Sequence, residues 1–529
     1  WKRIKRNYTA PEGAVYTTVG LEIAGEAQLY IDDASFTENG SDVNLLVNGD
    51  FETPAGFEYS FDRYSENVLS VENALERAGE CNISVCVLLS PHYFPKRIMD
   101  KYGFGFENGT AFIKYNIHAP EAKAVIERYM RGIIPVIKEY DSLSSICISN
   151  EPSFEIARAG DYFMDEWHQF LEDRYGTIEN LSQTYGKNYS SFEDVGYDRG
   201  YYNYDYIEFV DGIFADWHRW MAEISKEEAP DVPIHSKLMG YLTGNSKEMN
   251  TFHCGADLAK YHDFLDWNGC DYANYIDNDG KPLAQELWYD YMRSVKNAPV
   301  INSEDHVIPN GDDNFDAEVA DYVAQNLYMG AIHGRGMSDI WVWERSYDET
   351  SKFDKSILFR PDVLSAVSKT AMDINRNAYE INALQTKEND IGILYSKSSV
   401  LLDKTAMSSM YQAYAACMFN GLKPGFIISS QLEKLNNYEY VIIPDTKYVT
   451  PEILSAVKAY GENGGKLIIM GNSSFKYSDK KISNSQSVID EIYSNAEVVD
   501  YTGLKNGIAS SSETDFYKSM RNVFDKYGL

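Results

Sequence analysis

Two glutamates each end a short apolar run whose composition is typical of a buried β-strand. Glu151 follows the run from Ser145 to Asn150, and Glu304 follows the run from Pro299 to Ser303. In a (β/α)8 barrel, the carboxyl ends of the parallel strands form the face that carries the functional side chains. The two positions therefore predict two carboxylates facing one another on one barrel. For either glutamate alone, a solvated acid at a strand end is the alternative.

The stretch from 57 to 387 alternates strand-like and helical patterns, as a parallel sheet requires. Apolar residues from 122 to 137 keep helical spacing, with Pro135 expected to kink the helix, and a second stripe covers 319–328. Only six strands are evident, and 57–61 could hold one of the two that an eight-stranded barrel still needs. The six predicted strands are 85–89, 145–150, 234–239, 271–275, 300–303 and 339–343.

The segments on either side of the predicted barrel have other patterns. Residues 1–56 show partial two-residue alternation and are similar to part of a carbohydrate-binding jelly roll. Residues 388–500 contain shorter α/β units, with buried strands at 440–444 and 466–470, which favours a flavodoxin-like layer. The glycine-rich sequence at 461–466 leads into a strand, so it predicts a turn and not a phosphate loop. Residues 501–529 form a C-terminal tail with one helical pattern.

The composition narrows the class of ligand. The 529 residues are enough for two or three domains, and the net charge of −32 disfavours nucleic acid, anionic membrane surfaces and strongly acidic polymers. A neutral ligand fits this charge best. No apolar run is long enough to predict a membrane helix. The chain opens without Met and without a signal-peptide pattern, which leaves the compartment open, with secretion or the periplasm favoured over the cytoplasm. The six cysteines include no CxxC pair, so we expect buried free thiols.

The predicted pair of carboxylates suits hydrolysis of a glycosidic bond, which uses one protonated and one ionised carboxyl group. Glu151 would be the acid/base, with its pKa raised by burial or by a neighbouring negative charge, and Glu304 would be the nucleophile. Asn150 could bond the 2-hydroxyl group of a sugar. Asn302 and His306 lie near enough in sequence to help keep Glu304 ionised.

Further side chains could complete the site, and for most of them a structural role is the alternative. His92 directly follows its strand and could donate to a substrate hydroxyl or make a structural hydrogen bond. Tyr275 ends another predicted strand and could bond the nucleophile. Trp343 could form the floor of the pocket or pack in the core, and Trp341 competes for the same role. His306 could equally be a solvated loop residue.

Two stretches resemble glycoside hydrolases of family 42, the β-galactosidase type, in the clan whose catalytic glutamates end the fourth and seventh barrel strands. The first is 170–181 (FLEDRYGTIENL) with Thr184-Tyr185-Gly186 behind it. The second is 341–346 (WVWERS), followed by Lys352-Phe353. The likeness covers about 57–500, and within it 388–500 resembles the trimerisation domain of that family. Glu344 and Tyr185 stand where the family usually has Arg and Trp.

The resemblance implies a retaining β-glycosidase that acts on β-linked galactosides or related oligosaccharides and assembles as a homotrimer. It requires no cofactor, and the sequence shows no spacing typical of a metal site. Three alternatives stay open. One is a non-catalytic carbohydrate-binding protein on a decayed barrel. Another is an inverting hydrolase or transglycosylase. The third is a sister glycosidase of other sugar specificity, such as a β-mannosidase or a galactan-degrading enzyme.

Overall fold

The computed structural model describes most of the chain from residue 61 onward. The described ranges are 61–105, 113–154, 162–197, 204–239, 257–273, 283–308, 317–341, 357–501 and 511–529, with residues 5, 7–9 and 37. The predicted β-rich segment at 1–56, most of the possible strand at 57–61, and two predicted site residues, Tyr275 and Trp343, lie outside these ranges.

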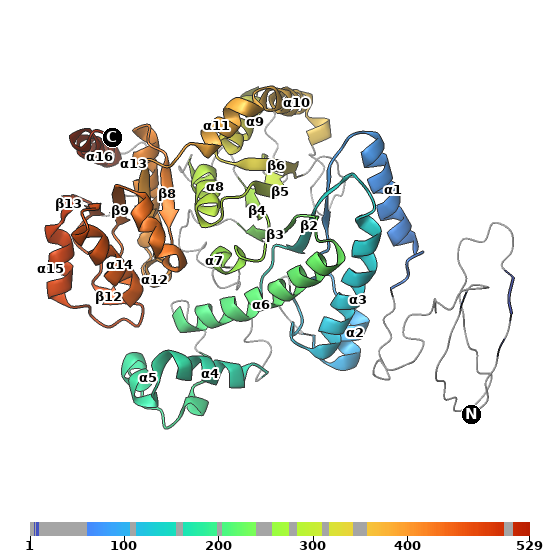
Figure 1. Ribbon diagram of the computed structural model, residues 1–529, viewed down its shortest axis with the longest axis horizontal. Helices are drawn as coiled ribbons and strands as arrows, with labels where there is room; N and C mark the ends of the chain where they lie inside the picture. The colour runs from blue at the N-terminus through green and yellow to red at the C-terminus, as the bar shows by residue number, and fades with distance from the viewer. Residues whose placement is uncertain are drawn as a thin grey trace.

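A parallel six-stranded sheet forms the centre of the molecule, with its strands in sequential order (Figure 1). Its strands are β1 (Val85–Leu88), β2 (Leu143–Asn150), β3 (Ile234–Met239), β4 (Asn268–Ala273), β5 (Val300–His306) and β6 (Arg335–Ile340). Every neighbouring pair is parallel. Sequential parallel order with intervening helices is the arrangement of a (β/α)8 barrel, and this sheet supplies six of its strands. The α/β class predicted from the sequence is confirmed.

Helices connect the strands and cover the sheet. The helix predicted at 122–137 is α3 (Pro120–Ile137), which begins at a proline and contains Pro135 in its last turn. The stripe predicted at 319–328 lies on α9 (Ala317–Ile332). The others in this part are α1 (Glu66–Glu80), α2 (Lys96–Tyr102), α4 (Met164–Tyr175), α5 (Ile178–Tyr185), α6 (Tyr204–Glu228), α7 (Leu258–Tyr261), α8 (Ala284–Val295), α10 (Pro361–Arg376) and α11 (Ala378–Thr386).

Three strands begin earlier than predicted, β2 by two residues at Leu143 and β4 and β6 by more. Strand β4 begins at Asn268, because Gly269 extends the strand where an Asn-Gly pair is more often a turn. A Cβ atom at Gly269 would lie 2.3 Å from the carbonyl oxygen of Ser236, so only glycine allows β3 and β4 to approach this closely. Strand β6 begins at Arg335, whose charge is neutralised by an ion pair with buried Asp305. Because β4 begins three residues before its predicted start, Asp271 lies nearer the carboxyl end of the strand than predicted.

A second parallel sheet follows in the chain and lies at the left in Figure 1. Its strands are β7 (Ile391–Leu394), β8 (Pro424–Ile427), β9 (Tyr440–Pro444), β11 (Lys466–Met470) and β13 (Ala496–Val499), in the order β13-β11-β9-β7-β8. Numbered along the chain this is 2-1-3-4-5, the flavodoxin-like order. Its helices are α12 (Lys397–Leu402), α13 (Ala406–Phe419), α14 (Pro451–Glu462), α15 (Gln486–Ser494) and α16 (Ser511–Tyr527).

The glycine-rich sequence before β11 is a turn, as predicted. Helix α14 ends at Glu462, and Gly464 has a φ of +94°, a left-handed conformation that glycine adopts without strain. The chain then enters β11, whose residues from Leu467 to Met470 are buried. A short pair, β10 (Tyr448–Val449) and β12 (Tyr477–Ser478), lies beside this sheet.

A buried cation joins the second sheet to the first part of the chain. Lys397, at the start of α12, pairs with Glu208 and Asp211 on α6 and with Asp257, which caps α7. Its Nζ lies 2.5 Å from Glu208 and 2.7 Å from Asp257, and its side chain is only 8% exposed. Burying a charge is costly unless it is paired, so these carboxylates hold α12 against α6.

Most of the described cysteines are free and at least partly buried, as the sequence predicted. The five cysteines within the described ranges are free, and Cys147, Cys270 and Cys417 are buried. Cys81 is exposed at the end of α1, so the prediction of a buried thiol is wrong there, because the helix ends at the surface. Within the described ranges, no helix has the length and apolar character needed to cross a membrane.

Candidate active site

Glu151 stands directly after β2 in a strained backbone conformation. Its φ is +40°, in the left-handed region that costs a residue with a side chain of order 1–3 kcal/mol. Its backbone N–H donates to the carbonyl oxygen of Lys237 on β3, at 3.0 Å. The hydrogen bond to the neighbouring strand offsets part of this cost and fixes the point where the chain leaves the sheet. Strain of this kind persists where the surrounding structure imposes it, which is common at functional sites.

Glu304 lies within β5 and is held by a hydrogen-bonded asparagine. The Asn302 side-chain oxygen accepts from the backbone N–H groups of Tyr272, at 3.3 Å, and of Glu304, at 3.4 Å. Its amide donates to the hydroxyl of Tyr289, at 3.0 Å. Asn302 is fully buried. It therefore supports the backbone of Glu304.

Two charged residues that the sequence analysis did not single out lie against the glutamates. Lys237 on β3 forms an ion pair with Glu304, and the two side chains are 5% and 11% exposed. Asp271 on β4 shares a hydrogen bond with the carboxyl group of Glu151. A lysine in a strand otherwise suited to burial was the available signal for Lys237. Asp271 was hidden because the predicted strand began at this residue, which placed it at the wrong end.

The two glutamates have opposite pKa shifts. Burial raises the pKa of Glu151, and the negative charge of Glu304 raises it further, outweighing its hydrogen bond with Asp271. Burial also acts to raise the pKa of Glu304, but hydrogen bonds from His306 and Lys237 more than offset it, and the pKa lies below its ordinary value. The two carboxyl groups are therefore close enough to influence one another, and one favours the proton while the other favours the charge.

Asp271 is the third acid of the site. Burial, with repulsion from Glu304 and Glu151, raises the pKa of Asp271 to about 8. Near neutral pH the Asp271 carboxyl therefore retains a proton, which it shares with Glu151 through their hydrogen bond. Since repelling carboxylates cannot all ionise together, the pKa values of Asp271 and Glu151 belong to the pair and are both raised.

The predicted histidines lie at the same end of the sheet. His306 Nε2 is 3.1 Å from a Glu304 oxygen, so this nitrogen carries the proton and donates to the carboxylate. The same nitrogen is 3.8 Å from Asp271. His92, in the loop after β1, is half-buried, and burial together with the charge of Lys237 lowers its pKa to about 4. His92 is thus a neutral imidazole near Lys237 at neutral pH.

The remaining predicted residues have mixed outcomes. Asn150 ends β2, is half-buried, and pairs in register with Lys237. Trp341 follows β6 and its ring centroid lies 6.0 Å from that of His306, so this tryptophan borders the carboxylates. The roles of Tyr275 and Trp343 stay predictions. Glu151, Glu304 and His306 are brought together as expected, and Lys237 and Asp271 complete the cluster.

Asp271, Glu304 and His306 place possible metal-binding atoms within 4.8 Å of one another, which the sequence spacing did not reveal. The donor set does not favour a metal ion. The ammonium group of Lys237 already pairs with Glu304, and the raised pKa of Asp271 keeps a proton on that carboxyl. A second group, Glu208, Asp211 and Asp257, surrounds the ammonium group of Lys397 in the same way.

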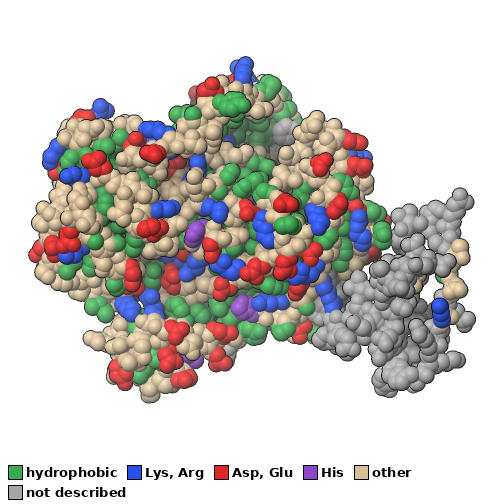
Figure 2. Space-filling view, in the orientation of Figure 1, with side chains coloured by type: hydrophobic (Ala, Val, Ile, Leu, Met, Phe, Trp, Pro, Cys, Tyr) green, Lys and Arg blue, Asp and Glu red, His purple; other side chains and the backbone are tan. Residues whose placement is uncertain are grey.

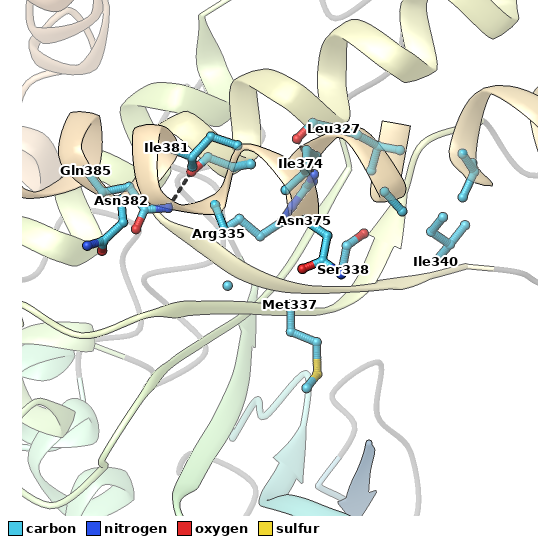
Figure 3. A pocket seen from close by; sticks show the side chains of 15 residues that line it. Leu327, Arg335, Met337, Ser338, Ile340, Ile374, Asn375, Ile381, Asn382 and Gln385 are labelled. Atoms are coloured by element: carbon cyan, nitrogen blue, oxygen red, sulfur yellow. Dashed lines mark hydrogen bonds between the residues drawn. The ribbon is translucent and has the colours of Figure 1, made fainter. Parts of the chain in front are cut away.

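A cavity of about 430 Å³ lies elsewhere, between β6 and helices α9, α10 and α11 (Figure 3). Its walls are mainly apolar, and its polar groups are Arg335, Ser338, Asn375, Asn382 and Gln385. None of the site carboxylates lines it. Arg335 pairs with Asp305, and Gln385 donates to the Ala331 carbonyl. This cavity is therefore not the carboxylate site.

Comparison with known proteins shows that the barrel region is similar to a known family. Residues 111–331 match the model of glycoside hydrolase family 42, described as beta-galactosidase. The beta-galactosidase LacZ of Heyndrickxia coagulans is 24% identical over 417 residues, which cover 71% of this chain and 58% of that protein. The beta-galactosidase bgaB of Geobacillus kaustophilus is 21% identical over 295 residues, covering 51% of this chain and 41% of that protein.

Solved structures share the fold. The exo-carrageenase of family 42 from Bacteroides ovatus superposes with a TM-score of 0.70 at 19% identity, covering 87% of this chain and 66% of that chain. The beta-galactosidase of Rahnella sp. R3 gives 0.66 at 16% identity, covering 81% and 66%. The chain thus spans about three-fifths of the length of the Heyndrickxia relative and slightly under two-thirds of these structures.

Proposed function

We infer that this chain, which is of the family 42 β-galactosidase type, is a retaining β-glycosidase acting on β-linked galactosides or related oligosaccharides. The observation that carries the proposal is that Glu151 and Glu304 lie at one end of the sheet and that Lys237 and His306 contact Glu304, which gives the two carboxyl groups opposite protonation preferences. A retaining glycosidase needs a protonated acid on one side of the scissile bond and an ionised nucleophile on the other.

In the first step Glu304 attacks the anomeric carbon. The bond between that carbon and the glycosidic oxygen breaks as Glu151 gives the oxygen a proton. In the second step Glu151 accepts a proton from water, whose oxygen attacks the anomeric carbon and releases Glu304. Lys237 and His306 favour the ionised nucleophile before the first attack and stabilise its charge as it returns.

The test compares wild type with Glu304→Ala on a panel of aryl β-glycosides that includes β-galactoside and β-mannoside. We expect wild-type turnover of the galactoside, a loss of at least about 10⁴-fold in the variant, and partial recovery with azide, which replaces the missing nucleophile. Equal rates in the two proteins would refute the assignment. NMR of the first-formed anomer separates retention from inversion.

The panel also includes carrageenan and other galactan oligosaccharides, because one solved structure that shares the fold is an exo-carrageenase. Turnover of these in place of simple β-galactosides would assign a galactan-degrading enzyme. Binding of oligosaccharides without hydrolysis of any would support the alternative of a carbohydrate-binding protein.

We further propose that 388–500 mediates assembly into a homotrimer, as the resemblance to the family implies. Light scattering of the purified chain at several concentrations tests this, and a monomer throughout would refute it. Figure 2 shows acidic side chains gathered over α4 and α5, whose like charges disfavour that face as a self-contact.

A further inference from the structure

We propose that Asp271 is a positioning residue for the acid/base step, sharing one proton with Glu151 and holding that carboxyl group beside the scissile bond. The inference rests on the proposed function and assigns a role that the pair of glutamates does not supply. It follows from where β4 places this side chain among the charged groups of the site.

The contacts of Asp271 join the two catalytic carboxyl groups. On one side it is hydrogen-bonded to Glu151, which follows β2. On the other it lies 3.8 Å from His306 Nε2, which itself donates to Glu304 on β5. The side chain is 12% exposed, so bulk water competes little for these bonds. Among the described residues, the charged or titratable groups that face it are Glu151, Glu304, His306 and Lys237.

A hydrogen bond between two carboxyl groups requires one proton between them. The raised pKa of Asp271 gives this residue a large share of that proton in the free enzyme. Glu151 is thus held as one member of a singly protonated pair, which is common where two carboxyl groups share a buried site. A lone Glu151 in the same place would have to hold its proton by itself.

The charge of the site stays constant through the reaction. Before the first step, Glu304 is ionised and the pair carries one negative charge. As Glu304 forms its ester bond, it loses its charge, and the pair gives its one proton to the departing oxygen and becomes doubly ionised. When water attacks, its proton returns to the pair and Glu304 regains its charge. One negative charge therefore moves between Glu304 and the pair while the total is unchanged.

A purely structural hydrogen bond and a shared proton lead to different pH dependences of the activity. If Asp271 only anchors a loop, removing its ionisation while keeping its shape would leave the pH dependence unchanged. If the pair shares a proton, the basic limb of the profile depends on Asp271. The substitution Asp271→Asn separates these cases, because the amide keeps the size and a donor toward Glu151 but cannot exchange the proton.

The experiment measures kcat/KM for an aryl β-galactoside from pH 4 to 9 in wild type, Asp271→Asn and Asp271→Ala. In the Asn variant, we expect the basic limb to move at least about one pH unit lower, with a loss near tenfold at pH 8 and a smaller loss at pH 5. The Ala variant should lose activity at every pH, because Glu151 also loses its anchor. A profile of Asp271→Asn that superimposes on wild type would overturn the proposal.

Asp266→Asn is the matched control. Asp266 precedes the same strand at its opposite end, pairs with Lys226 and is 39% exposed. Its profile should match wild type. Circular dichroism of each variant reports whether it is folded. If Asp271→Asn does not fold, a carboxyl ¹³C NMR titration of wild type takes its place. In that titration, an ordinary aspartate pKa at Asp271 would overturn the proposal. Absence of wild-type turnover on the whole panel would instead refute the proposed function.

Discussion

The ammonium group of Lys237 on β3 pairs with the carboxylate of Glu304 on β5, across the end of the strand that lies between them. Both side chains are nearly buried, so the pair acts in a medium where charge interactions are strong. The pairing sets which of the two glutamates is ionised. It also means that Glu304, the proposed nucleophile, depends on a residue from another strand.

Replacing Lys237 should therefore move the acidic limb of the pH profile. Glu304 must be ionised to attack, and in wild type its lowered pKa keeps it ionised as the pH falls. In Lys237→Met, burial is no longer opposed by the ammonium group, so the pKa should rise. We expect the acidic limb of kcat/KM to move upward by about one unit or more, with at least a tenfold loss at pH 5. Lys96→Met, at an exposed pair with Asp100, is the control.

Removal of Glu151, the proposed acid/base, should change how the rate depends on the leaving group. Glu151→Ala can still form the ester at Glu304 when the leaving phenol needs no proton. We expect a small effect on the first step for a dinitrophenyl glycoside and a loss of about 10²–10⁴-fold for an alkyl glycoside. Steady-state and burst kinetics with a series of leaving groups measure this. A uniform loss across the series would show that Glu151 does not act as the acid.

Stability should also respond to pH through Asp211. Burial, with repulsion from Asp257 and Glu208 and despite Lys397, raises the pKa of Asp211 from 3.8 to about 7. The folded state therefore holds a proton that the unfolded state has released between these pH values, and this group makes the protein less stable as the pH rises through them. In Asp211→Asn, the free energy of unfolding should gain on wild type from pH 4 to 7 and then level off.

Urea denaturation at several pH values measures this difference. Asp216→Asn, at an exposed position on the same helix, should follow wild type at every pH. A difference between Asp211→Asn and wild type that does not change with pH would contradict the prediction.

The buried pair of Asp305 and Arg335 offers a test without a change of pH. Arg335 Nη1 donates to Asp305 at 2.6 Å, and Ser338 donates to the same carboxylate at 2.5 Å. Asp305→Ala leaves a guanidinium that is 3% exposed without its partner. We expect a loss of about 3–5 kcal/mol in the free energy of unfolding. Asp100→Ala, at an exposed pair with Lys96, should cost under about 1 kcal/mol.

Some strands and site residues could be predicted from the sequence and others could not, depending on the chemistry of each segment. Strands β9 and β11 lie at their predicted bounds, because continuous apolar runs bordered by turn residues have few alternatives. Strand β4 was displaced, because Gly269 serves a close approach that no local pattern encodes. The glutamates were found by their position after such runs. Lys237 and Asp271 were missed because their importance comes from neighbours on other strands.

Lys397 has a consequence for how the chain can be divided. The three carboxylates that surround it belong to the barrel helices and their caps, while the lysine itself belongs to α12, which follows the first strand of the later sheet. A shortened protein that stops before residue 388 would leave Glu208, Asp211 and Asp257 repelling one another around an empty centre. The two sheets are thus mutually dependent, and excising either one should be harder than the chain's modular appearance suggests.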